Sequence, residues 1–155
     1  MRMLPILLII PLVSVISCTK SPTQGACQPG KPCHEWVVKP VDSKAAGKII
    51  RKNPKINILD VRTPAEFAKG HIKGAINVDF KSPDFARNIA KLNNHVPYIL
   101  HCRSGNRSGQ SLEILKKNNF GTLYHLEGGF NEWQASGQPV AQEGNQASTP
   151  AAAKE

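Results

Sequence analysis

The stretch VPYILHCRSGNRSG, residues 96–109, decides the fold class of this chain. It begins with an apolar run that is typical of a buried β-strand and ends where a helical pattern starts, near Arg107. Between them lies a short loop of small and basic residues that includes Gly105. A strand that turns through a short loop directly into a helix is the repeating unit of α/β domains. The stretch therefore predicts one such unit, with Cys102 at the tip of its strand.

Strand and helix patterns alternate on both sides of this unit. We expect strands at 36–38, 56–61, 75–78, 96–102 and 122–126, and helices at 42–52, from 63, at 82–92, 107–118 and 130–135. The helix at Thr63 has a capping residue, Pro64 at its first position and Glu66 to reach back to the cap. This alternation predicts a three-layer α/β domain with a mainly parallel central sheet flanked by helices.

Cys102 is the candidate nucleophile. Ligands of parallel sheets collect at the carboxyl ends of the strands, where this cysteine is expected. Backbone N–H groups of a tight turn can converge on an anion, and a helix N-terminus adds partial positive charge, so a thiol there ionises more easily. The neighbouring Arg103 and Arg107 can hold an anionic substrate. The alternative is a buried structural cysteine beside a solvated basic turn, and the combined pattern favours catalysis.

Three segments resemble the signatures of rhodanese domains. They are ILDVRTPAEFAKGHIKGAINV (58–78), HCRSGNRS (101–108) and LEGGFNEWQASGQPV (126–140). The three occur in the family's order, and the resemblance covers residues 35–140. It is greatest to the small, exported, single-domain members. The resemblance implies the rhodanese-like fold and a thiosulfate-type sulfurtransferase that needs no cofactor and no metal.

The resemblance also implies roles for the loop. Cys102 would take the outer sulfur of a small anionic donor as a persulfide and pass it to cyanide, a thiol or a protein acceptor. Arg103 and Arg107 would bind the anionic end of the donor. The backbone amides that would cradle the persulfide belong to Arg103, Ser104, Gly105, Asn106, Arg107 and Ser108. The alternative function is a non-catalytic persulfide carrier or thiol-binding partner module, although this loop retains its cysteine.

A cysteine phosphatase or arsenate reductase uses similar parts. Those enzymes place five residues between the cysteine and an arginine, whereas this chain has four between Cys102 and Arg107, and Ser108 occupies the next position. The shorter loop suits a single sulfur atom better than a tetrahedral oxyanion. The loop also offers no carboxylic general acid for a leaving group. We therefore favour sulfur transfer.

Residues around the second strand are expected to support the loop. We favour an ion pair between Arg62 and Glu66, with a hydrogen-bonded Asp60 that braces the turn; the alternative is that Arg62 extends the positive rim and Asp60 orders the loop. His71 resembles a structural position of the family, and we expect it to bind backbone. Strand alternation should turn His101 to the opposite face from Cys102.

The first 17 residues have the pattern of a lipoprotein signal peptide. Arg2 precedes a short apolar run, and the run ends in Val15-Ile16-Ser17-Cys18, which resembles the bacterial lipobox. The resemblance implies a lipid on Cys18, cleavage before it, and a membrane anchor facing the periplasm or cell exterior. Thr19 favours the outer membrane in a Gram-negative cell. An ordinary secretory signal with a chance cysteine is the alternative.

The residues that flank the domain have a different composition. Residues 18–34 are rich in Pro, Gly, Ser and Thr and predict a flexible tether; residues 141–155 have no large apolar side chain and predict a disordered tail. Outside the cytoplasm, Cys27 and Cys33 are expected to form a disulfide. A redox pair that resolves the Cys102 persulfide, or a metal site with His34, is the less favoured alternative.

The whole chain is basic. It has 20 Lys and Arg against 11 Asp and Glu, a net charge of +9, which favours anionic partners. Export excludes nucleic acid from the expected partners. The residues between the two flanking segments suffice for one modest core, and we expect a monomer.

Overall fold

The computed structural model describes residues 35–142. The predicted signal peptide, Cys18, the tether and the Cys27–Cys33 disulfide lie outside these residues, as does the predicted tail from residue 143 onward. Within 35–142, none of the helices has the length and apolar run that crossing a bilayer requires.

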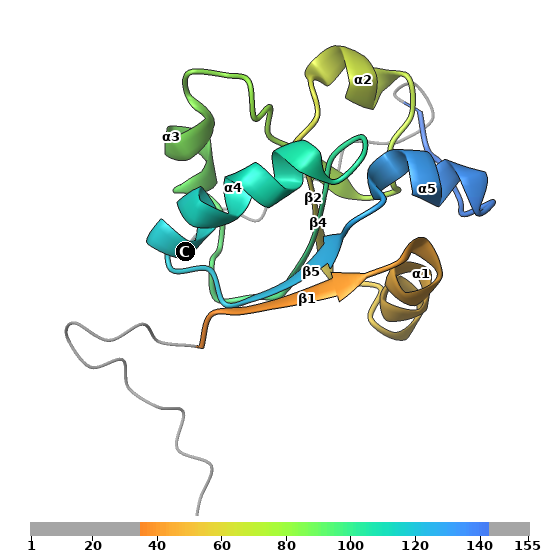
Figure 1. Ribbon diagram of the computed structural model, residues 1–155, viewed down its shortest axis with the longest axis horizontal. Coiled ribbons are helices and arrows are strands. Elements are labelled where there is room, and N and C mark those ends of the chain that lie inside the picture. Colours follow the sequence, from red (N-terminus) through yellow and green to blue (C-terminus); the bar gives the residue numbers. More distant parts are fainter. Residues whose placement is uncertain (1–34, 143–155) are drawn as a thin grey trace, which may run out of the picture.

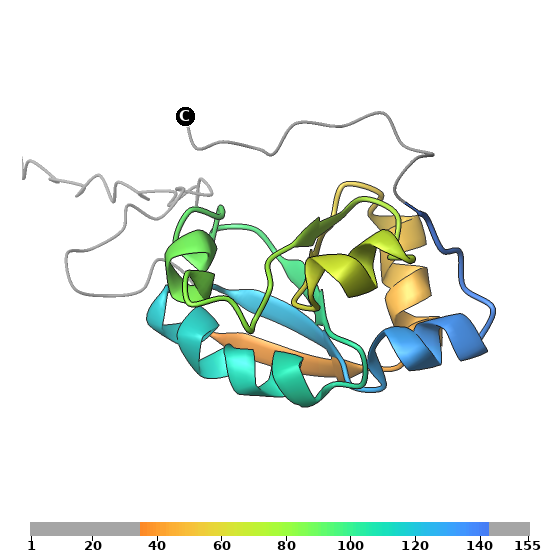
Figure 2. The same cartoon turned by 90° about the horizontal axis from the view of Figure 1, so that it is seen from above.

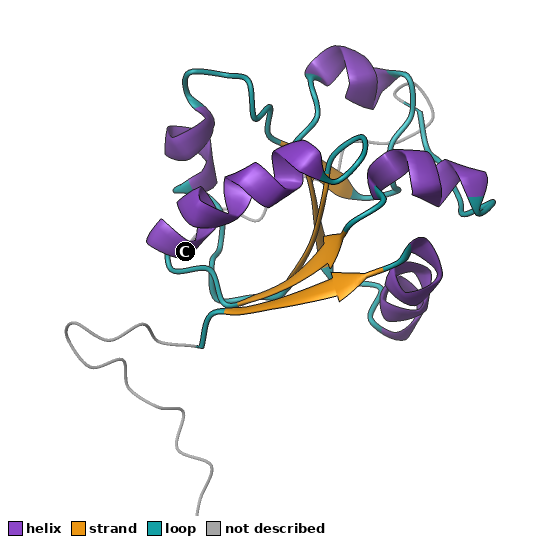
Figure 3. Cartoon of the chain, in the orientation of Figure 1, coloured by secondary structure: helices purple, strands orange, loops and turns teal. Residues whose placement is uncertain are grey.

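Strands and helices alternate along the described chain (Figures 1 and 3). In chain order the elements are β1 (Val37–Val41), α1 (Ser43–Lys52), β2 (Asn57–Asp60), α2 (Pro64–Ala68), β3 (Ala75–Asn77), α3 (Phe85–Ile89), β4 (Tyr98–His101), α4 (Asn106–Lys117), β5 (Thr122–Leu126) and α5 (Gly129–Ala135). The strands form one sheet in the order β1-β5-β4-β2-β3, and every pair is parallel. The α/β fold with a parallel sheet is thus confirmed.

Alternate residues of each strand supply two separate cores, one on each face of the sheet. Leu59, Leu100 and Leu123 pack against α3 and α4. Ile58, Ile99 and Leu126 lie on the opposite face of the same strands and instead pack against α1 and α5. Figure 2 shows the two helix pairs on either side of the sheet. Cys102 belongs to the first core, so it continues the face of β4 that α4 covers.

The helix starts at 42 and 63 are confirmed. Asp42 caps α1 by accepting a hydrogen bond from the Ala45 N–H (2.6 Å). At α2, the Thr63 hydroxyl accepts from the Glu66 N–H and the Glu66 carboxylate accepts from the Thr63 N–H, which is a complete capping box. The two hydrogen bonds between Thr63 and Glu66 hold the start of α2 close to the end of β2, where the candidate site lies.

The helix predicted at 82–92 is wrong in length, because α3 covers only Phe85–Ile89. Ser82 starts a turn instead, in which the Phe85 N–H donates to the Ser82 carbonyl oxygen (3.0 Å). Pro83 suits the second position of such a turn, and its ring disfavours helical geometry at Ser82. The tight turn leaves only a short helix over the first core.

β1 and the start of the predicted tail also differ from prediction. β1 extends past residue 38 to Val41 and tolerates Pro40 because it is an edge strand. Ala141, assigned to the tail, pairs with His71 in an antiparallel bridge whose two hydrogen bonds are both 2.8 Å. A backbone bridge needs no large apolar side chain, so composition alone gave no signal for it.

Candidate active site

Cys102 follows β4 at the carboxyl end of the sheet, at the start of the loop 102–105. It is a free cysteine. Burial raises the pKa of its thiol, but hydrogen bonds from the Ser108 hydroxyl and from the N–H groups of Ser108, Ser104 and Arg107 outweigh burial, so the pKa lies below its ordinary value. The loop thus surrounds the sulfur with donors that favour the thiolate, the nucleophilic form.

The closing segment after β5 holds this loop in shape. The Phe130 N–H donates to the Cys102 carbonyl oxygen (2.8 Å), and the Asn131 N–H donates to the Arg103 carbonyl oxygen (3.0 Å). Gly105 has a φ of 85° and lies against the Glu127 carbonyl, which a Cβ atom at this position would overlap. The loop and the closing segment therefore fit together only where Gly105 has no side chain.

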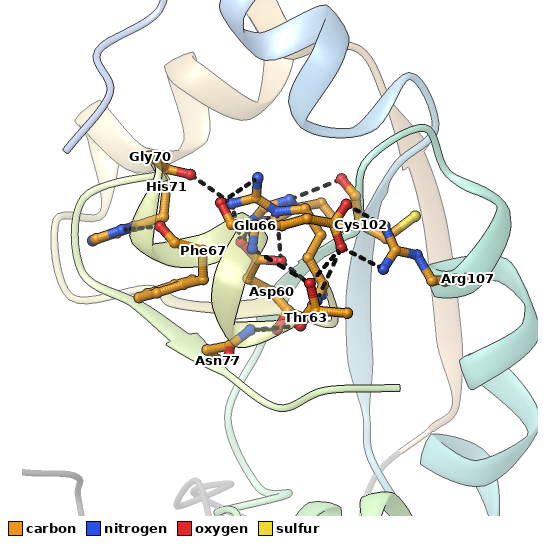
Figure 4. A network of polar contacts seen from close by, with 11 residues as sticks. Asp60, Thr63, Glu66, Phe67, Gly70, His71, Asn77, Cys102 and Arg107 are labelled. Carbon is orange, nitrogen blue, oxygen red and sulfur yellow. Dashed lines mark hydrogen bonds and ion pairs between the residues drawn. The ribbon is translucent and has the colours of Figure 1, made fainter. Parts of the chain in front are cut away.

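Glu66 pairs with Arg107, across 41 residues of sequence (Figure 4). Two guanidinium nitrogens of Arg107 donate to the two carboxylate oxygens, both at 2.8 Å. The hydrogen-bonded Arg107 guanidinium and the hydrogen bonds from Thr63 lower the pKa of Glu66 to about 2, although burial acts to raise it. The expected Arg62–Glu66 side-chain pair is therefore wrong: Arg62 reaches only the Glu66 carbonyl oxygen (3.4 Å), because Arg107 occupies the carboxylate.

Arg62 instead forms a buried ion pair with Asp60. Its guanidinium donates to both Asp60 carboxylate oxygens and to the Gly70 carbonyl oxygen (2.8 Å), and stacks 4.0 Å from the centre of the Phe130 ring. The side chains of Arg62 and Asp60 are 4% and 0% exposed, so Arg62 does not extend a positive rim. Asp60 also accepts from the Arg62 N–H (2.9 Å), which confirms that it braces the turn after β2.

The Cys102 loop opens on a cleft of about 460 Å³. Its lining residues are Thr63, Glu66, Lys81, Cys102, Arg103, Ser104, Asn106 and Arg107. Arg103 and Lys81 are exposed, whereas the charge of Arg107 is balanced by Glu66. Lys81 was not among the predicted site residues. Its position shortly after β3 was a usable signal, because the carboxyl ends of parallel strands share one edge of the sheet. The cleft is thus a polar site with two exposed cations.

His71 and His101 take the expected positions. His71 Nδ1 lies 3.1 Å from the Phe67 carbonyl oxygen, and its ring stacks on Phe67. His101 points to the face opposite Cys102, fully buried, with Nε2 3.6 Å from an Asp60 oxygen and without a hydrogen-bond partner among the described residues. Burial lowers the pKa of His101 more than Asp60 raises it, so the ring is neutral at pH 7.

We expect the buried His101 to make the fold sensitive to mild acid. Its pKa in the folded chain lies below the ordinary value of 6.5, so its contribution to stability is complete above pH 6.5. As the pH falls below 6.5 the unfolded chain binds a proton that the folded chain does not, and the free energy of unfolding decreases. Urea unfolding at pH 7.5, 6 and 5 should show a steeper loss for the wild type than for His101→Gln. Equal losses in the two chains would contradict this assignment.

The comparisons with known proteins agree with this geometry. A profile of the Rhodanese-like domain matches residues 43–136. The chain belongs to the rhodanese-like domain family. Among solved structures, a rhodanese-related protein from Thermoplasma volcanium superposes with a TM-score of 0.55 and 26% identity, over 71% of this chain and all of that chain. The resemblance of the three sequence segments to this family is thereby confirmed.

Two curated relatives are similar to this chain in sequence. Thiosulfate sulfurtransferase GlpE from Pseudomonas putida is 36% identical over 97 residues, which are 62% of this chain and 86% of that protein. The uncharacterized protein YqhL from Bacillus subtilis is 37% identical over 79 residues, which are 51% of this chain and 61% of YqhL. This chain thus spans less than two thirds of YqhL but most of GlpE. These relatives support a rhodanese-type sulfurtransferase family.

Proposed function

We propose that this protein is a sulfurtransferase that carries sulfur as a persulfide on Cys102. The single observation that supports it most is the ring of donors around Cys102 Sγ, formed by the Ser108 hydroxyl and the N–H groups of Ser104, Arg107 and Ser108. Such a ring stabilises negative charge on one sulfur atom. The same donors remain in place to stabilise a second sulfur that carries the charge after transfer.

In the first step the Cys102 thiolate attacks the outer sulfur of thiosulfate. A sulfur–sulfur bond forms to Cys102, the bond inside thiosulfate breaks, and sulfite leaves with its electron pair. In the second step a thiophilic acceptor such as cyanide attacks the terminal sulfur of the persulfide. The Cys102 thiolate then leaves and thiocyanate is released. Neither step needs a proton from the protein or an external oxidant, which suits a cleft whose lining carboxylate, Glu66, is paired with Arg107.

The two exposed cations of the cleft, Arg103 and Lys81, bind the anionic end of the donor. Arg107 is engaged by Glu66, so its main contribution is to fix the loop and to contact the sulfur. This division refines the expectation from sequence that the two loop arginines share the donor. Physiological acceptors in this proposal are small thiols or the thiol of a partner protein.

Lys81→Ala is expected to raise KM for thiosulfate about threefold to fivefold, with kcat nearly unchanged, because one exposed ion pair is lost in ground and transition states alike. The matched control is Lys91→Ala, an exposed lysine that does not line the cleft. The effect of Lys81→Ala should shrink at higher ionic strength. Equal KM values for the two variants would exclude Lys81 from donor binding.

We further propose that the protein is lipid-anchored through Cys18 and acts outside the cytoplasm, which the lipobox-like sequence supports. In a bacterial host, the full chain should fractionate with membranes, and Cys18→Ser should move it to a soluble or uncleaved form. A Cys18→Ser chain that still acquires lipid and is cleaved normally would contradict the anchor.

The proposed activity is tested by turnover of the full chain with thiosulfate and cyanide, measured as thiocyanate formed per protein molecule. The proposal predicts many turnovers for the wild type and none for Cys102→Ser. A non-catalytic carrier would load sulfur once and then stop unless its partner were added. At most one thiocyanate per molecule would therefore overturn the catalytic proposal.

A further inference from the structure

Ser108 connects the Cys102 thiol to an imidazole that the motifs do not include. Its hydroxyl oxygen lies 3.5 Å from Cys102 Sγ, 2.9 Å from His125 Nε2 and 2.9 Å from the Gly105 carbonyl oxygen. The Ser108 side chain is fully buried, and His125 is half-buried. His125 comes from β5 on the face that α4 covers, and a Cβ atom at Gly109 of α4 would lie 3.9 Å from its ring, in ordinary van der Waals contact.

The hydroxyl of Ser108 has a single proton for these three neighbours. A carbonyl oxygen and a thiolate only accept hydrogen bonds, whereas a neutral imidazole nitrogen either donates or accepts, according to its tautomer. If His125 Nε2 accepted, three acceptors would compete for one proton. If it donates to the serine oxygen, only the Gly105 carbonyl and the Cys102 sulfur share that proton. The second arrangement satisfies more of these groups.

We propose that His125 is a positioning residue for the Cys102 thiolate. Its Nε2–H donates to Ser108 Oγ, which keeps the serine proton available to the sulfur of Cys102. His125 does not line the cleft, and it acts on the sulfur through Ser108. Its use in catalysis rests on the proposed sulfur transfer, but the acidity of the thiol is measurable without any sulfur donor.

Few other charged groups face the Cys102, Ser108 and His125 side chains. Burial lowers the pKa of His125 by more than Glu127, which follows β5, and a hydrogen bond to the Gly105 backbone raise it. The ring is therefore neutral at pH 7, and its tautomer decides the direction of the hydrogen bond to Ser108. Arg107 of α4 contacts the sulfur from the other side and is paired with Glu66. Substitution of His125 leaves that ion pair in place.

The test compares two variants of similar size. Glutamine carries an N–H donor near the position of Nε2, and methionine carries none. The rate of iodoacetamide alkylation at Cys102 is followed against pH in the full chain, on the tryptic peptide 92–103, which contains no other cysteine. His125→Met should lower the rate near pH 6.5 about fivefold to tenfold and move the midpoint up by about one unit, while His125→Gln stays within about twofold of wild type.

Three outcomes would overturn the proposal. The first is that both variants alkylate at the wild-type rate. The second is that both shift the alkylation midpoint equally, which would assign the effect to packing of the ring. The third is that His125→Met lowers the alkylation rate by its full amount even in a Ser108→Ala background. The ¹⁵N spectrum of the wild-type chain gives a check that needs no substitution: the proposal requires the Nε2–H tautomer of His125, and the Nδ1–H tautomer excludes it. Because no readout here involves sulfur transfer, failure of this proposal is distinguishable from failure of the proposed function.

Discussion

Arg62→Met is expected to lower the free energy of unfolding by about 3–5 kcal/mol, because it leaves the buried Asp60 carboxylate without its counter-charge. Arg62 supplies the side-chain donors that both Asp60 oxygens accept, and its own side chain is only 4% exposed. Domains of this size are commonly stable by about 5–15 kcal/mol, so the loss is a large fraction of the total. The measurement is equilibrium unfolding in urea at pH 7.5.

The chain offers a matched control in the Arg87–Asp84 pair. This pair has a similar distance, 2.9 Å, but its side chains are 74% and 49% exposed. Arg87→Met should therefore cost less than about 1 kcal/mol. Adding Asp60→Asn to Arg62→Met should recover part of the stability, since the stranded charge is removed. If Arg62→Met costs no more than Arg87→Met, the buried pair does not hold the turn after β2.

Gly105→Ala is expected to reduce thiosulfate turnover on the order of 100-fold or more, the scale seen when a hydrogen-bond donor is removed from an anion site. The added Cβ overlaps the Glu127 carbonyl, so the loop must move away from the closing segment. The N–H groups of Ser104, Arg107 and Ser108 then no longer converge on Cys102 Sγ. The pKa of the thiol should rise at the same time, which the pH dependence of alkylation measures.

Gly74→Ala is the control that separates the effect of the Gly105–Glu127 contact from the effect of backbone strain at a positive φ. Gly74 has a φ of 80°, close to the 85° of Gly105, but no atom lies within 4 Å of the position that its Cβ would take. A left-handed alanine costs about 1–2 kcal/mol of stability and should leave turnover unchanged. Equal turnover in the two variants would show that the Gly105–Glu127 contact does not shape the loop.

Local sequence signals predicted the position of the candidate site correctly. The apolar run before Cys102 and the helical pattern after Gly105 locate the loop, because both signals depend on neighbouring residues alone. The capping box at Thr63 was predicted in the same way, because it depends only on residues 63–66. Strand alternation also placed His101 and Cys102 on opposite faces of the sheet. Cys102 belongs to the first core, whereas His101 stacks on Phe130 of the second.

The pairing of charges could not be predicted in the same way. Nearness in sequence favoured Arg62 as the partner of Glu66, whereas the fold brings Arg107 to Glu66 from 41 residues away. Arg62 then turns back to Asp60, and this choice depends on the burial of both. His125 was missed for the same reason, because it reaches the site only through the pairing of β5 with β4.

Mass spectrometry of the full chain after incubation with thiosulfate tests whether Cys102 carries a persulfide. We expect the 92–103 peptide to gain one sulfur atom, about 32 Da, and cyanide to remove it. Cys102→Ser should show no gain. A reduced, free Cys102 that gains no sulfur from thiosulfate would contradict the account.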